Sequence, residues 1–209
     1  MSNSASPSQS RLTETTRWVL TTRALHIGQH AVADLSVRDA ALPIMRELRK
    51  ETGETAHLMV LEGQRAVLIE KVETEHPIRA VITLGSAVPL HGSSNGKAML
   101  AQRGEDEVRA LLGGKLVRHT DTTIVEWPAF LAELAAVRER GYATNVGEWR
   151  TDISAVASPI FDHEGAALAS LSISAPGSRM PADLRERYGA LVTEAARRVS
   201  ATLGHRRPA

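Results

Sequence analysis

The sequence predicts an α+β domain in which an antiparallel sheet is flanked by helices. Strand-like runs occur in two groups, at residues 55–84 and 153–174, and segments with helical spacing lie between and outside these groups. Turn-like connections within each group are short, which favours antiparallel neighbours over the crossovers that a parallel sheet needs. This order of elements indicates an α+β fold rather than alternating βαβ units.

Composition excludes several classes of protein. The 209 residues contain no cysteine, which rules out disulfides, thiolate metal sites and cysteine nucleophiles. Twenty-five basic and 24 acidic side chains leave a net charge of +1, so no global basic field indicates a nucleic-acid partner. Apolar runs are far shorter than the ~20 residues that a bilayer span needs, and residues 1–10 lack a signal-type segment. We therefore expect a cytoplasmic protein with no membrane partner.

The amino-terminal part divides into two segments. Residues 1–16 are rich in Ser, Thr, Asn and Gln and are expected to be a disordered lead. Residues 17–35 begin with β-formers and change to helical spacing, which predicts a short strand that runs into a linker helix.

A helix is predicted from Ser36, which forms a possible capping box with Asp39. Pro43 should bend this helix and Gly53 should end it. Its buried stripe consists of Val37, Ala41, Ile44, Met45 and Leu48.

Three strands of an antiparallel meander are expected next, at residues 55–61, 65–75 and 78–84. A loop at 85–93 leads to a short helix that begins at Asn95. A second helix is predicted at 105–112, and a third begins at Pro128 and ends at Gly141.

The second strand group is a hairpin formed by residues 153–161 and 166–174. In its second strand one face carries Ala167, Ala169, Leu171 and Ile173, and the other carries Leu168, Ser170, Ser172 and Ser174. The serine face is either the solvent side of an edge strand or the lining of a cavity for a small polar ligand. Asn145, Glu148 and Trp149 precede the hairpin and could reach the same region. A last helix ends at Gly204, and residues 205–209 form a basic tail.

Residues 89–98 are the main candidate site, because small and hydroxyl residues precede the helix that begins at Asn95. The N–H groups of Asn95, Gly96 and Lys97 would favour a bound carboxylate. A phosphate-binding P-loop is excluded, since only three residues separate Gly92 from Gly96 and alanine follows Lys97. A purely structural loop remains an alternative.

Two enzymatic interpretations remain open on sequence alone. Ser94 and Lys97 have the Ser-x-x-Lys spacing of penicillin-interacting enzymes, although no Lys-Thr-Gly completes that motif. His91 with Ser93 or Ser94 could belong to a triad whose acid is not identified.

Metal binding is not predicted, and neither is a cofactor. His26 and His30 have the i, i+4 spacing of a metal clamp, but a third ligand is lacking, so a solvated helix face is favoured.

Seven segments, in this order and spacing, resemble the IclR-type bacterial transcriptional regulators. They are WVLTTRALHIG at 18–28, ETGET at 51–55, PLHGSSNGKA at 89–98, RGYA at 140–143, SPIFD at 158–162, LSISAP at 171–176 and SATLG at 200–204. The resemblance implies a GAF-like effector-binding domain, placed here at residues 36–204. It also implies a linker helix to an amino-terminal winged helix-turn-helix that dimerises on operator DNA, and control of catabolic operons by small organic acids.

The resemblance also assigns a pocket. In glyoxylate- and pyruvate-responsive members its lining falls here on Ser94, Asn95, Asn145, Ile153, Ala155, Ser172 and Ser174, and the helix-start argument adds Gly96. Several positions depart from that subgroup: Ser94 and Asn95 replace Gly and Ala, Asn145 replaces Asp, Ala155 replaces Cys and Asp152 replaces Gly. These changes alter the shape and charge of the pocket, which predicts a different ligand.

A winged helix-turn-helix needs ~60–70 residues, whereas residues 1–35 alone precede the expected effector domain. The sequence is therefore expected to begin late relative to the natural gene product, or to be a stand-alone sensor. In either case we expect a non-enzymatic homodimer or homotetramer that binds a small organic acid, with operator DNA contacted only through an amino-terminal domain absent from this chain. The alternatives are a ligand-binding or dimerisation module without DNA binding and a serine hydrolase that uses Ser94 and Lys97.

Overall fold

The computed structural model describes residues 32–205. The expected disordered lead at 1–16, residues 17–31 of the expected linker, His26, His30 and residues 206–209 of the expected tail lie outside the described residues. Within the described part, helices flank an antiparallel sheet, which confirms the predicted α+β class. No helix in this part is long and apolar enough to cross a membrane.

The sheet joins the two strand groups of the sequence. Its order is β3-β2-β1-β6-β5-β4, and every neighbouring pair is antiparallel. The predicted turn at 62–64 joins β1 to β2, and the predicted hairpin joins β5 to β6. The two groups meet where β1 pairs with β6. The strands are β1 (Thr55–Glu62), β2 (Arg65–Val72), β3 (Ala87–Pro89), β4 (Ala143–Val146), β5 (Ile153–Phe161) and β6 (Ala167–Pro176).

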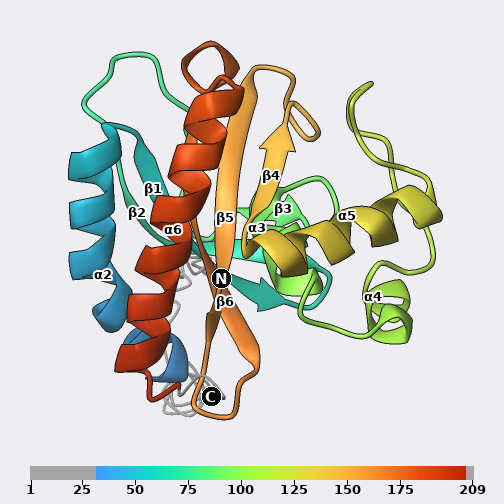
Figure 1. The fold of residues 1–209 in the computed structure, drawn as a ribbon, viewed down its shortest axis with the longest axis horizontal. Helices are drawn as coiled ribbons and strands as arrows, with labels where there is room; N and C mark the ends of the chain where they lie inside the picture. Colours follow the sequence, from blue (N-terminus) through green and yellow to red (C-terminus); the bar gives the residue numbers. More distant parts are fainter. Residues whose placement is uncertain (1–31, 206–209) are drawn as a thin grey trace, which may run out of the picture. The chain divides into compact units, whose positions relative to one another are not determined.

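Helices cover both faces of this sheet. The long helices α2 (Val32–Thr52) and α6 (Ala182–Thr202) run side by side along one face (Figure 1), and an Arg198–Glu47 ion pair of 2.7 Å links them. On the other side lie α3 (Ser94–Leu100), α4 (Glu105–Leu111) and α5 (Trp127–Arg140), and the 3-10 turn η1 (Gly177–Arg179) precedes α6. Of these, α3 lies directly across β5 and β6.

Each face of the sheet has its own apolar core. Leu58, Leu171 and Ile173 are fully buried against α2 and α6. Ala157 and Met59 belong to the second core, with Phe130, Leu134 and Val137 from α5. The predicted ends of α2 and α5 are confirmed, since Gly53 and Gly141 take left-handed backbone conformations that favour glycine.

Two boundaries predicted from the sequence are wrong. First, α2 (Val32–Thr52) continues through Ser36 without a break. Residues 32–35 of the expected linker helix and the helix expected from Ser36 are therefore one helix, because no helix breaker separates them. Second, residues 78–84 form a loop, and the third strand is β3, inside the expected 85–93 loop. The run at 78–84 has strand-like composition, but Ile78, Val81 and Leu84 are more than half exposed, whereas Val88 of β3 is buried.

Candidate functional site

The serine row of β6 lies in the interior, beneath α3. Ser170, Ser172 and Ser174 are exposed by 0%, 1% and 5%. Because β6 pairs with β1 on one side and β5 on the other, it is a central strand. The interpretation of the serines as the solvent side of an edge strand is therefore wrong. A buried row of hydroxyls needs hydrogen-bond partners from the protein or from a ligand.

The start of α3 is closed by the protein itself. Ser93 Oγ accepts the Gly96 N–H at 3.1 Å and donates to the Pro89 carbonyl at 2.7 Å, while the Lys97 N–H donates to the Ser93 carbonyl at 3.0 Å. The expectation that the N–H groups of Gly96 and Lys97 are free for a carboxylate is therefore wrong, because Ser93 caps this helix.

Gly96 has a packing role instead. A Cβ atom at this position would lie 2.1 Å from the Leu90 carbonyl oxygen. Only glycine lets α3 approach the preceding segment this closely. Gly96 therefore fixes the depth at which its neighbours Ser94 and Asn95 lie over the sheet.

Two asparagines of the predicted site hold its walls together. Asn95 Nδ2 donates to Ser170 Oγ at 3.0 Å, which ties α3 to β6. Asn145 Nδ2 donates to the Gly92 carbonyl at 2.8 Å, and Asn145 Oδ1 accepts the Glu148 N–H at 3.0 Å. Both side chains are buried. The resemblance assigns both to the predicted pocket, and in the structure each makes a buried hydrogen bond that braces its own segment.

Lys97 belongs to a buried ion pair. Its ammonium lies 2.7 Å from Glu148 Oε1 and 3.6 Å from Glu133 Oε1, and its side chain is 1% exposed. Burial raises the pKa of Glu148 above the ordinary carboxyl value, although the nearby Lys97 charge acts in the opposite direction.

Neither predicted catalytic pairing is assembled among the described residues. A serine–lysine hydrolase needs a lysine beside its serine that can take the proton. Lys97 instead contacts two carboxylates. His91 Nε2 donates to the Val117 carbonyl at 2.7 Å rather than to Ser93 or Ser94.

Five buried side-chain atoms lack a hydrogen-bond partner among residues 32–205, and three of them belong to uncharged groups on the α3 side: Ser94 Oγ, Ser172 Oγ and His57 Nε2. His57 and Ser172 are directly opposite each other in the β1–β6 pair, so their side chains share one face. Leaving such an atom unpaired costs about 1–3 kcal/mol. Glu148 Oε2 and Arg103 Nε are also unpartnered. The first three are neutral groups that could hydrogen-bond a ligand.

His57 is a candidate that sequence reasoning missed. It is 2% exposed, and burial, with help from the nearby Lys71 charge, lowers its pKa from 6.5 to about 4. The imidazole is therefore neutral near pH 7 and can donate or accept at Nε2 depending on its tautomer. The alternation of side chains along a strand could have identified it. His57 lies between Ala56 and Leu58 and therefore faces away from the apolar core that contains them.

The remaining predicted residues lie along the same part of the sheet. Ala155 pairs with Ser174 on one side and with Asn145 on the other, so these three residues form one row across β6, β5 and β4. Ile153 pairs with Pro176 at the end of the hairpin and is half-buried. Ala155 contributes only a methyl group at the centre of this row.

Comparisons with known proteins point in one direction. Residues 29–201 match the family model described as "Bacterial transcriptional regulator IclR C-terminal". The HTH-type transcriptional repressor AllR of Escherichia coli K12 is 35% identical over 188 residues, which cover 90% of this chain and 69% of AllR. The HTH-type transcriptional regulator KdgR of the same strain is 34% identical over 193 residues, which cover 92% of this chain and 73% of KdgR.

Solved structures agree with the sequence relatives. The Thermotoga maritima IclR structure superposes with a TM-score of 0.79 at 33% identity, covering 92% of this chain and 78% of that one. The C-terminal domain of E. coli KdgR superposes with a TM-score of 0.73 at 35% identity, covering 81% of this chain and 99% of that domain.

Proposed function

Because this chain belongs to the IclR family of bacterial transcriptional regulators and contains the family's C-terminal domain, we propose that residues 36–204 bind a small organic acid that controls transcription. The proposal covers an effector site between α3 and the β1–β6–β5 part of the sheet. Operator DNA is then bound by the helix-turn-helix part of such a regulator, in a homodimer or homotetramer, and the controlled genes form a catabolic operon.

The observation that carries the proposal is the set of unpartnered atoms Ser94 Oγ, Ser172 Oγ and His57 Nε2. Serine hydroxyls donate well to carboxylate oxygens, and hydrogen bonds to a charged acceptor are stronger than neutral ones. The neutral His57 imidazole suits a second polar group on the ligand. Ala155 and Ala157 on the neighbouring strand have small side chains, which suits a ligand of few atoms.

The proposed effector site is connected to the amino-terminal side of the domain by a short stretch of the chain. His57 lies in β1, which begins two residues after Gly53 ends α2. Helix α2 leads directly back to the preceding part of the chain. A ligand regulates DNA binding only if it has different affinities for two arrangements of the regulator. We propose that contact with β1 and α3 provides this difference.

The experiment is a thermal-shift screen of organic acids, followed by calorimetry on each acid that stabilises the protein. Ser172→Ala and Ser174→Ala should each weaken binding about tenfold, which corresponds to the loss of one charge-assisted hydrogen bond. Ser158→Ala is the matched control, because this buried serine on β5 has its own partner, the Gly141 carbonyl at 2.9 Å. Unchanged affinity of both variants for every bound acid would show that the proposed pocket is wrong.

A further inference from the structure

A cavity lies outside the proposed effector site. It has a volume of about 390 Å³ and is bounded by the β2–β3 edge of the sheet, the end of α4 and the connection that leads to α5. This volume is within the usual range of small-molecule sites. Its apolar lining includes Leu90, Leu111, Leu112 and Trp149. Neither Ser172 nor His57 lines it.

Every ionisable side chain in the lining of this cavity is basic. They are Arg65 and Lys115, which are exposed to solvent, together with His91 and His119. Among the described residues, neither Arg65 nor Lys115 has an acidic group within 4.0 Å, whereas the nearby Arg109 is paired with Glu105 at 2.8 Å. Unpaired cations around an apolar floor attract an anion that carries an apolar body.

His91 forms the inner part of the basic lining. It is 5% exposed, and its ring centroid lies 5.2 Å from that of His119. Burial is the largest effect on the pKa of His91, and it lowers this pKa. The charges of His119 and Lys97 lower it further, whereas the hydrogen bond to the Val117 carbonyl raises it. Lys97 itself is paired with Glu148 and Glu133, so the positive charge that an anion would meet in this cavity comes from Arg65 and Lys115.

The cavity is connected to the walls of the effector site through the chain itself. His91 precedes Gly92, whose carbonyl is held by Asn145. Trp149 follows Glu148, which pairs with the buried Lys97. A ligand in this cavity would therefore contact both segments that fix the start of α3.

We propose that this cavity is a second ligand site, which binds a small anion with an aromatic or aliphatic body through Arg65 and Lys115. The site is separate from Ser94, Ser172 and His57 of the proposed effector site, and it does not depend on the identity of the effector. A carboxylate and a phosphate monoester share the required chemistry, and paired probes with the same apolar body distinguish them.

The experiment follows the indole N–H resonance of Trp149 in the full chain during titration with 2-naphthoate. The chain has three tryptophans, and loss of one peak in Trp149→Phe assigns the resonance. We expect a saturable shift with 2-naphthoate and binding at least about tenfold weaker with the neutral 2-naphthol, since the naphthol lacks the charge-assisted contacts. Comparison with 2-naphthyl phosphate then shows which anion is preferred.

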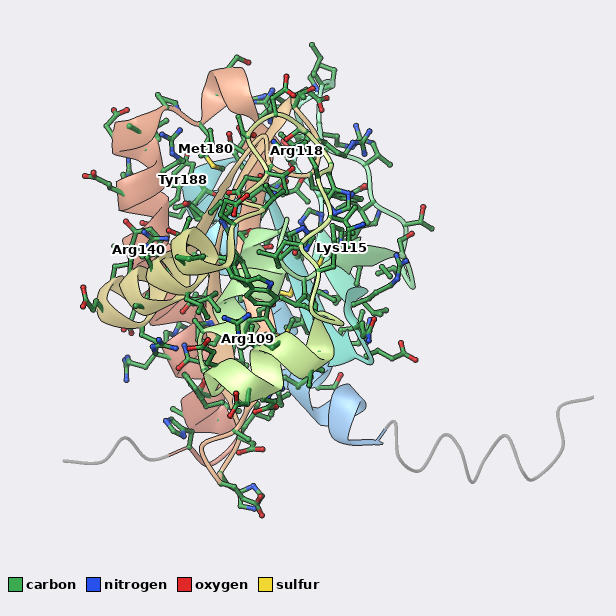
Figure 2. All side chains as sticks on the ribbon, turned by 90° about the vertical axis from the view of Figure 1, so that its right-hand side faces the viewer. Arg109, Lys115, Arg118, Arg140, Met180 and Tyr188 are labelled. Carbon is green, nitrogen blue, oxygen red and sulfur yellow. The ribbon has the colours of Figure 1, made fainter. Side chains whose placement is uncertain are left out.

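The double variant Arg65→Gln/Lys115→Gln should weaken binding of 2-naphthoate by at least about tenfold. Arg118→Gln is the matched control: Figure 2 labels Lys115 and Arg118 on the same connection, but Arg118 does not line the cavity. Ser172→Ala should leave binding of 2-naphthoate unchanged, which separates this proposal from the effector site. The proposal is overturned if no saturable shift occurs, if the double variant binds like the wild type, or if Arg118→Gln causes an equal loss.

Discussion

The two faces of the central strands differ in chemistry although they are equally buried. Toward α2 and α6, Leu58, Leu171 and Ile173 are fully buried in an apolar core. Toward α3, the alternate positions His57 and Ser172 are exposed by only 2% and 1% yet keep unpartnered polar atoms. Apolar burial stabilises a fold, whereas unpaired polar burial costs free energy until a partner binds. The first face therefore contributes stability along its whole length, whereas the second combines the apolar core around Met59 and Ala157 with unpaired polar positions that suit a ligand.

The largest effect should come from breaking the ion pair on the α3 side. Lys97→Met leaves the buried Glu148 carboxyl without its cation, which should lower the free energy of unfolding by about 3–5 kcal/mol. Urea denaturation measures this change. Adding Glu148→Gln to Lys97→Met should restore most of the loss. Wild-type stability in Lys97→Met alone would contradict the assignment of Lys97 as a structural cation.

Neighbouring residues of β6 test the comparison of the two faces directly. Leu171→Ala should cost about 2–5 kcal/mol, because it leaves a cavity in a fully buried apolar core. Ser172→Ala should be neutral or stabilising, since it removes a buried hydroxyl that makes no hydrogen bond within the described residues. Chemical denaturation of both variants gives the comparison. If Ser172→Ala were as damaging as Leu171→Ala, the polar face would be structural.

The smallest effect is a pH dependence that arises from His57. Its pKa is about 4 in the folded protein and 6.5 as the ordinary value. Between these values the unfolded chain binds a proton that the folded protein does not, so the free energy of unfolding falls as the pH is lowered. The slope due to His57 is at most about 1.4 kcal/mol per pH unit.

Denaturation curves between pH 7 and pH 5 measure this slope, and His57→Gln should remove the contribution. Replacement of the exposed His163 by Gln is the control and should leave the slope unchanged. A wild-type slope in His57→Gln would mean that His57 is not held neutral by burial.

Local signals predicted much of the fold. Pro128 and Gly141 placed α5 within one residue, and alternation placed Ser172 and Ser174 on the face opposite Leu171. Such signals depend on a few adjacent residues, so they predict the structure without knowledge of the tertiary contacts. The prediction of a strand at 78–84 is wrong because a strand needs a neighbouring strand to pair with. The available edge of β2 pairs with β3 instead.

The sequence by itself determined the α+β class, the alternation of the hairpin strands and the resemblance to the IclR-type regulators, because periodicity, turn residues and motifs are properties of short segments. Only the tertiary structure decided which polar groups meet. The β1–β6 pair brings His57 opposite Ser172, residues that are far apart in the chain, and Ser93 occupies the N–H groups that the sequence left available at α3. Hydrogen-bond partners are set by non-local packing, so the identity of the unpaired atoms is known only after the chain has folded.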